Sequence, residues 1–143
     1  MLLVEDNLGD VRLIQEALKE AGFAEAFSVA HGDDEALRQL KRRGSAGAPL
    51  YNLVFLDLNL PGMSGRELLS EIKSDRTLMH IPVVIITTSE ADHDILQCYR
   101  HQASAYVSKA VGLERFLQEM QTCFAFWFKV AKLPMACDKQ AEA

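Results

Sequence analysis

One segment carries an apolar strand, an acidic residue and a turn into a helix: Leu53-Val54-Phe55-Leu56-Asp57-Leu58-Asn59-Leu60-Pro61-Gly62-Met63-Ser64-Gly65. Its first part, Leu53–Leu56, predicts a strand that runs into Asp57. The turn that follows is rich in glycine and proline, and the stretch Glu67–Ser74 behind it predicts a helix. A strand followed by a helix is the unit from which parallel sheets are built.

The same unit occurs five times along the chain, which predicts an α/β protein. The other predicted strands are Met1–Val4, Phe27–Ala30, Val83–Ile86 and Ala105–Val107, and the other predicted helices are Asp10–Ala21, Asp33–Arg43, Ala91–His101 and Leu113 to about Lys132. Alternation of this kind favours a parallel sheet with helices on both faces. Right-handed crossovers narrow the choice to a doubly wound sheet.

Side chains that can bind a metal ion or take part in a reaction follow four of these strands. Glu5-Asp6 follows the first strand, Asp57 the third, Thr87 ends the fourth and Lys109 comes after the fifth. Because the carboxyl ends of parallel strands share one edge, we expect these side chains around one cleft. Crowded carboxylates repel one another, and a divalent cation relieves that repulsion. Oxygen ligands without histidine or cysteine favour Mg²⁺ over Zn²⁺. Taken alone, Asp6 or Asn7 could equally serve only to cap the next helix.

Composition limits the classes of protein to consider. A chain of 143 residues that is 49% hydrophobic suits one globular domain. No run approaches the roughly 20 apolar residues of a membrane-spanning helix, and no secretory signal is visible. Three cysteines without metal-ligand spacing, Cys98, Cys123 and Cys137, predict reduced thiols in the cytoplasm. The net charge of −5 argues against a nucleic-acid-binding protein.

From Leu2 to about Gln121 the sequence resembles the receiver domains of two-component signalling. The resemblance is carried by Val4-Glu5-Asp6-Asn7, Leu56 to Gly65, Ile86-Thr87-Thr88-Ser89 and Tyr106-Val107-Ser108-Lys109. It implies a flavodoxin-like fold, with five parallel strands in the order 2-1-3-4-5 and five helices, of which the last is extended.

The resemblance also implies a role for each residue of the cleft. The implied set is Asp57 as phosphoacceptor, Asp6, Asp57, the Asn59 carbonyl and (through water) Glu5 around Mg²⁺, Lys109 on the phosphoryl oxygens, and Thr87 with Tyr106 as a switch. Two positions depart from the family pattern. Ala110 stands where a proline usually follows the lysine, and Thr88 is bulkier than the small residue often found there.

The predicted last helix is apolar on two sides. One stripe, from Leu113 to Ala131, is expected to pack on the core. A second face with Cys123, Phe126 and Val130 predicts a contact with a second subunit, in a homodimer, or with a partner. The alternative is that the extension folds back on its own domain. The predicted division is a receiver domain at 1–122, a helix extension at 123–135 and a polar tail at 136–143.

These features predict a single-domain response regulator that receives its phosphoryl group from a histidine kinase and signals by protein contact, not an enzyme with an external substrate. The tail and Asn7-Leu8-Gly9-Asp10-Val11 resemble regulators that partner phytochrome kinases. Two alternatives stay open. One is a receiver-fold adaptor that works without phosphorylation. The other is an aspartate-based phosphatase, against which Asn59 stands where such enzymes carry a second acid.

Overall fold

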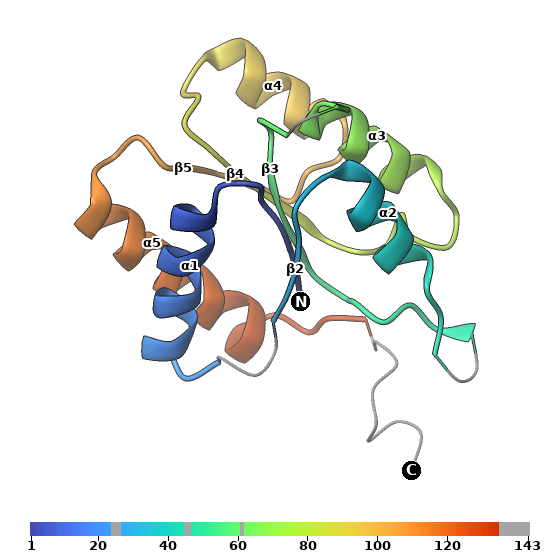
Figure 1. The fold of residues 1–143 in the computed structure, drawn as a ribbon, viewed down its shortest axis with the longest axis horizontal. Helices are drawn as coiled ribbons and strands as arrows, with labels where there is room; N and C mark the ends of the chain where they lie inside the picture. The colour runs from blue at the N-terminus through green and yellow to red at the C-terminus, as the bar shows by residue number, and fades with distance from the viewer. Residues whose placement is uncertain (24–26, 45–46, 61, 135–143) are drawn as a thin grey trace.

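The computed structural model describes residues 1–23, 27–44, 47–60 and 62–134 (Figure 1). The strands are β1 (Leu2–Val4), β2 (Ser28–Ala30), β3 (Val54–Asp57), β4 (Val83–Thr87) and β5 (Ala105–Ser108), and the helices are α1 (Leu8–Glu20), α2 (Asp33–Lys41), α3 (Gly65–Ser74), α4 (Asp92–Arg100), α5 (Leu113–Ala125) and η3 (Phe126–Val130). Their order confirms the predicted alternation of strand and helix. The residues Pro61 and Cys137 and the predicted tail 136–143 lie outside the described residues.

The five strands form one parallel sheet in the order β2-β1-β3-β4-β5, which confirms the predicted doubly wound fold. Near the carboxyl ends of the strands, the paired residues are Val4 with Leu56, Asp57 with Ile86, and Thr87 with Ser108. The register therefore brings the ends of β1, β3, β4 and β5 to the same edge of the sheet.

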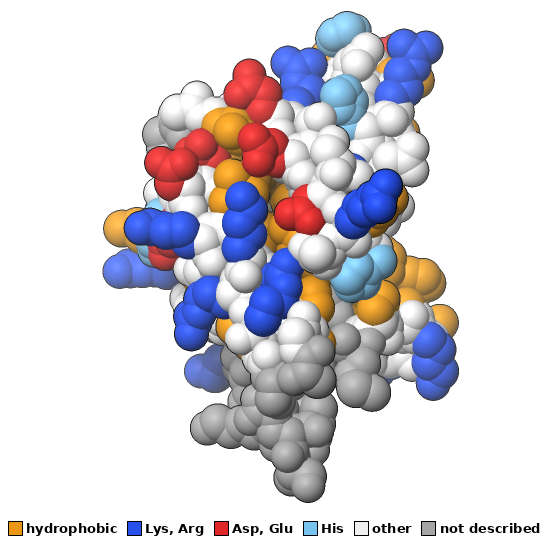
Figure 2. Space-filling model, turned by 90° about the vertical axis from the view of Figure 1, so that its right-hand side faces the viewer, with side chains coloured by type: hydrophobic (Ala, Val, Ile, Leu, Met, Phe, Trp, Pro, Cys, Tyr) orange, Lys and Arg blue, Asp and Glu red, His pale blue; other side chains and the backbone are white. Residues whose placement is uncertain are grey.

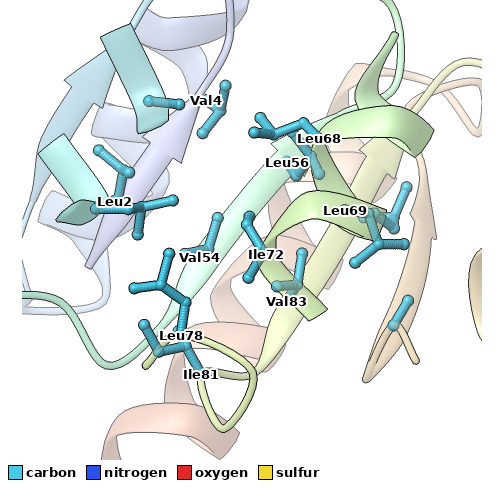
Figure 3. Packing of buried hydrophobic residues seen from close by; sticks show 14 of the residues in the cluster. Leu2, Val4, Val54, Leu56, Leu68, Leu69, Ile72, Leu78, Ile81 and Val83 are labelled. Atoms are coloured by element: carbon cyan, nitrogen blue, oxygen red, sulfur yellow. The ribbon is translucent and has the colours of Figure 1, made fainter. Parts of the chain in front are cut away.

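Helices cover both faces of this sheet: α1 and α5 lie on one side, and α2, α3 and α4 on the other (Figure 1). Successive side chains of a strand point to opposite faces, so both faces must be apolar. In β1, Leu2 and Val4 join the cluster under α2 to α4, whereas Leu3 joins the cluster under α1 and α5. Figure 3 shows the first cluster, where Leu68 and Ile72 of α3 face the strands.

The last helix ends earlier than predicted and changes its winding. After α5 the five residues of η3 form a π-helical turn, which is closed by a hydrogen bond of 2.8 Å from the Ala131 N–H to the Phe126 carbonyl. Ala131 is extended, so the prediction of a helix to about Lys132 is wrong by two residues. Pro134 disfavours a helical conformation at the residue before it, which limits how far the helix can run.

The described part of the extension folds back on its own domain. The Phe128 ring lies 5.0 Å from the Phe23 ring, measured between centroids. Beyond η3, the Asn52 side-chain amide donates a hydrogen bond of 2.9 Å to the Pro134 carbonyl. Of the predicted contact face, Phe126 is 47% and Val130 67% exposed, while Cys123 is half-buried against the core. The side of the extension that carries Phe128 therefore folds back on its own domain, whereas Phe126 and Val130 stay exposed.

A pair of truncations in η3 should separate the two faces of the extension. We expect Phe128→Ala to lower the free energy of unfolding by about 2 kcal/mol, because it removes ring packing against Phe23 and Phe124. Phe126→Ala, which removes a half-exposed ring, should cost less than about 1 kcal/mol. Urea unfolding at low protein concentration measures both values. Equal losses for the two variants would contradict the fold-back arrangement.

The surface seen in Figure 2 carries both signs of charge. Most of the Asp and Glu side chains seen there gather in one part of the face, whereas the Lys and Arg side chains are spread over it singly, with no continuous basic area. Within the described ranges, none of the helices combines the length and the apolar character needed to cross a membrane.

Candidate functional site

The side chains predicted to meet at the carboxyl edge of the sheet do meet there. One carboxylate oxygen from each of Glu5, Asp6 and Asp57 lies within 4.8 Å of the other two. The Lys109 ammonium is 3.4 Å from Asp57 Oδ2, although the two residues are 52 positions apart in the sequence. The convergence expected from the strand ends is therefore confirmed for the three acids and the lysine.

A cavity of about 420 Å³ opens over these groups. It is lined by Asp6, Asn7, Asp10, Asp57, Asn59, Thr88 and Lys109. Glu5 and Thr87 do not line it, because both are fully buried. Asp6 is exposed and Asp57 is only 5% exposed, so solvent reaches the acidic cluster from the Asp6 side. A small anionic or cationic group can enter here, whereas a large ligand finds no deep pocket.

Local hydrogen bonds explain how the loops after β1 and β3 are held. The Asn7 side chain caps α1 by accepting a hydrogen bond of 3.0 Å from the Asp10 N–H, so of the two candidate caps, Asp6 and Asn7, the structure selects Asn7. After β3 the chain turns back, and the Asn59 N–H donates to Asp57 Oδ1 at 3.2 Å. This contact fixes one oxygen of Asp57 and leaves Oδ2 directed to Lys109.

Lys109 lies among three carboxylates. Its ammonium forms ion pairs with Glu5, with Asp10 at 2.8 Å and with Asp57 at 3.4 Å. Burial acts to lower the pKa of Lys109, but the hydrogen bonds with Asp10 and Glu5 outweigh it and raise that pKa above its usual value. Lys109 is therefore a permanent cation in the site.

Glu5 is the buried member of the acidic cluster. Burial, followed by its hydrogen bond with Asp57, raises the pKa of Glu5 to about 8, and the opposing contact with Lys109 does not cancel this effect. A carboxyl group with a raised pKa binds its proton more tightly in the folded state than in the unfolded state. Without a cation, the site therefore disfavours full ionisation of its acids.

The raised pKa of Glu5 gives a pH-dependent stability. Without divalent cations, this group stabilises the fold at acidic pH, and its contribution is lost as the pH rises from about 4.5 to about 8. We expect the decline measured by urea unfolding in EDTA to be smaller in Glu5→Gln, which does not titrate. Glu16→Gln, an exposed change on α1, is the matched control. Parallel profiles for the wild type and Glu5→Gln would contradict this account.

The predicted switch residues both contact the loop after β4. The buried Thr87 hydroxyl oxygen accepts a long hydrogen bond of 3.4 Å from the Ser89 N–H. The Tyr106 hydroxyl donates to the Ser89 carbonyl at 3.0 Å. No role was predicted for Ser89, which connects the two residues. Ser89 stands two residues after the end of β4, at the end of the segment Ile86-Thr87-Thr88-Ser89 that carries part of the resemblance.

Ala110 does not displace Lys109 from the site. The described residues contain no cis peptide bond, so the Lys109–Ala110 bond is trans. The Lys109 N–H donates to the Thr87 carbonyl at 2.7 Å and so continues the pairing of β5 with β4. From this backbone the Lys109 ammonium reaches to 3.4 Å from Asp57 Oδ2, so Ala110 does not remove the lysine from the site. Thr88, the other departure, lines the cavity.

Asp10 was predicted as part of a helix and of the segment that resembles phytochrome-partner regulators, but not as part of the site. A signal was present, because Asp10 comes four residues after Asp6 and belongs to the first turn of α1, which starts at the same sheet edge. Of the two described cysteines, neither Cys98 nor Cys123 lines the cavity. Cys98 and Cys123 are free thiols, and burial raises the pKa of Cys123 to about 11, which keeps it protonated.

A doubly wound sheet of this order, with acids, a lysine and a hydroxyl gathered at its carboxyl edge, is the arrangement of a receiver domain. Residues 1–121 match the family model of the response regulator receiver domain. The chain belongs to this family of signalling proteins.

Known relatives narrow the assignment within the family. Response regulator Rcp1 of Synechocystis sp. strain PCC 6803 is 36% identical over 137 residues, which are 95% of this chain and 93% of the relative. A crystal structure of the phosphorylated cyanobacterial phytochrome response regulator RcpA has a TM-score of 0.83 at 40% identity, covering 94% of this chain and 96% of that one. The Mn²⁺-bound form of Rcp1 has a TM-score of 0.83 at 36% identity, covering 94% and 97%. This chain is thus homologous to response regulators of phytochrome signalling.

Proposed function

We propose that Asp57 accepts a phosphoryl group from a histidine kinase and that this modification switches the contacts of the domain with other proteins. The single observation that supports the proposal is the meeting of Lys109 with Glu5, Asp6 and Asp57 over one open cavity. The relative RcpA has been crystallised in a phosphorylated form, which is consistent with the proposal.

The residues present fit a hard divalent cation such as Mg²⁺. Oxygens of the three carboxylates Glu5, Asp6 and Asp57 lie close enough together to share one cation, and the fully buried Glu5 has a raised pKa in its absence. Mg²⁺ takes few protein ligands and keeps several waters, so the half-open cavity suits it. We assign Asp6, Asp57 and the Asn59 carbonyl as ligands, with Glu5 acting through water. When bound, the cation would neutralise charge on the phosphoryl oxygens.

The chain's own groups then perform the transfer. An Asp57 carboxylate oxygen bonds to phosphorus while the bond from phosphorus to the donor histidine nitrogen breaks, and the electron pair stays on that nitrogen. Negative charge spreads over the equatorial oxygens in such transfers, so positioning and positive charge supply most of the catalysis. Lys109, already 3.4 Å from Asp57 Oδ2, provides that charge. The protein would catalyse only its own phosphorylation and dephosphorylation.

The acyl phosphate would act through the loop after β4. A phosphoryl group adds acceptor oxygens that can recruit the Thr87 hydroxyl and draw Ser89 with it. Because the Tyr106 hydroxyl donates to the Ser89 carbonyl, movement of this loop would change the position of the Tyr106 side chain on β5. Thr87 and Tyr106 therefore stay the proposed switch residues. Action in the cytoplasm, with a phytochrome-type histidine kinase as the donor, stays a prediction from the sequence and the relatives.

Intact mass spectrometry tests the proposal on the wild-type protein. Incubation with acetyl phosphate and Mg²⁺ should add the mass of one phosphoryl group, and EDTA should prevent the addition. Hydroxylamine should attack the acyl carbon, release phosphate and leave a hydroxamate, and that change in mass would identify the modification as an acyl phosphate. A wild-type protein that takes up no phosphoryl group under saturating donor and Mg²⁺ would refute the proposed function.

We further propose a homodimer through the outer face of the extension, formed by Cys123, Phe126 and Val130. Phe126 and Val130 are exposed apolar residues on one short turn, and Phe126 packs edge-on to Trp127 with centroids 5.1 Å apart. We expect Val130→Asp to shift sedimentation from dimer to monomer and to change the emission of Trp127, the only tryptophan of the chain. Leu96→Asp, a similarly polar change at an exposed position of α4, is the control. A wild-type protein that stays monomeric at high concentration would contradict the dimer.

A further inference from the structure

The carboxylates around Lys109 differ in what else they can bind. Glu5 and Asp57 belong to the set of acids whose oxygens lie within 4.8 Å of one another, and Asp10 does not. A cation held by that set would compete with the Lys109 ammonium for Glu5 and Asp57. Among the described residues, Asp10 is then the one ion-pair partner of Lys109 that does not belong to the acids around the cation.

The position of Asp10 is fixed by the fold and not only by its ion pair. Its N–H donates to the cap residue Asn7 at 3.0 Å, in the first turn of a thirteen-residue helix that packs on the core through Val11 and Ile14. Its carboxylate lines the cavity and accepts from Lys109 at 2.8 Å, against 3.4 Å for Asp57. The Asp10 side chain is 31% exposed, so it is a partner at the rim of the site, whereas Lys109 is only 8% exposed.

We propose that Asp10 is a positioning residue for the transfer reaction: it holds the Lys109 ammonium at the cavity when the metal cation engages Glu5 and Asp57. This inference rests on the proposed function. A lysine side chain has four flexible torsions, and holding it in place lowers the cost of bringing its charge to the phosphoryl oxygens. Because a charge-assisted hydrogen bond to a partly buried group is strong, its loss should slow phosphorylation by roughly tenfold.

Asp10 also has an electrostatic effect that acts against the rate of phosphorylation. Its negative charge at the mouth of the cavity repels an anionic phosphodonor, so removing it would speed the reaction if repulsion were the larger effect. Two variants separate these effects. Asp10→Asn removes the charge but keeps an oxygen that accepts from the ammonium, and Asp10→Ala removes both. Glu16→Ala removes one charge from the exposed side of the same helix and is the matched control.

The first experiment measures phosphorylation by acetyl phosphate at saturating Mg²⁺, with Mn²⁺ affinity measured separately by calorimetry. We expect the wild type and Glu16→Ala to react equally, Asp10→Asn to react at an intermediate rate, and Asp10→Ala to react roughly tenfold more slowly with Mn²⁺ affinity changed by less than about threefold. An unchanged or faster Asp10→Ala, or a parallel loss of Mn²⁺ affinity, would overturn the inference.

The second experiment does not depend on phosphorylation. A buried, ion-paired lysine ammonium exchanges its protons slowly and gives a ¹H–¹⁵N signal, which the Lys109→Arg variant would assign. In the presence of Mg²⁺ we expect this signal in the wild type and Asp10→Asn but not in Asp10→Ala. A signal that survives in Asp10→Ala overturns the inference even if the protein is phosphorylated. If the wild type takes no phosphoryl group, the proposed function fails, and this signal still decides whether Asp10 holds Lys109.

Discussion

Asp57→Asn should abolish phosphorylation by acetyl phosphate in the presence of Mg²⁺, with no added phosphoryl mass after the wild type is fully modified. An amide oxygen is a poor nucleophile, and the substitution also removes one of the three clustered carboxylates that would hold the cation. Each loss alone would slow the reaction, and the two act on the same step. Intact mass spectrometry over the time course measures the result.

The variant should fold at least as well as the wild type when divalent cations are absent. The change removes one negative charge from a crowded cluster, and Lys109 keeps its ion pairs with Glu5 and Asp10. Urea unfolding in EDTA checks this expectation and separates loss of the phosphoacceptor from loss of the fold. Asp34→Asn, an exposed change in the first turn of α2, should be phosphorylated like the wild type. Phosphoryl mass on Asp57→Asn would identify a different acceptor.

Gly65→Ala should lower the free energy of unfolding by about 3 kcal/mol, the largest stability loss that we expect from adding a single methyl group. A Cβ at Gly65 would overlap the Asp57 carbonyl oxygen and lie 2.5 Å from the Leu58 Cα. These are backbone atoms, so no side chain can move aside. The Gly65 N–H also donates to the Leu58 carbonyl at 2.9 Å, which places the start of α3 directly on the chain that carries Asp57.

The same substitution should weaken the metal site. Pushing α3 away from residues 57–58 shifts the backbone of Asp57, and we expect calorimetry to show a lower affinity for Mn²⁺ than in the wild type. Gly32→Ala is the control, because no atom lies within 4 Å of its added Cβ and its φ of −171° is open to any residue. Gly32→Ala should cost less than about 1 kcal/mol. A Gly65→Ala protein as stable as Gly32→Ala would contradict the close contact.

The strand ends were predictable because a parallel sheet leaves little freedom. An apolar run without polar alternation must be covered on both faces, so Val54, Phe55 and Leu56 by themselves indicate a central strand. The carboxyl ends of such strands share an edge, and the convergence of Glu5, Asp6, Asp57 and Lys109 follows from that rule. The residue-by-residue roles came from the resemblance and not from the pattern.

Helix contacts were less predictable, because an amphipathic pattern shows which side is apolar but not what covers it. From the sequence, the aromatic residues after Ala125 were compatible both with packing against a partner protein and with packing against their own domain. The ring of Phe23, which closes on Phe128, decides between them for the inner face. It follows α1, more than 100 positions earlier in the chain, and its partner in the last helix could not be identified from the sequence.

The amino-acid sequence by itself determined the five strand-and-helix units, the order in which they occur and the acids and the lysine that end the strands. Only the tertiary structure decided which carboxylates share the Lys109 ammonium, that Asp10 is one of them, that Glu5 is buried beneath the cavity while Asp6 is exposed, and where the last helix stops. The physical reason is the separation along the chain of the residues that interact. Periodicity and strand termini are local properties of the chain, whereas an ion pair or a buried charge depends on side chains that the complete fold brings together.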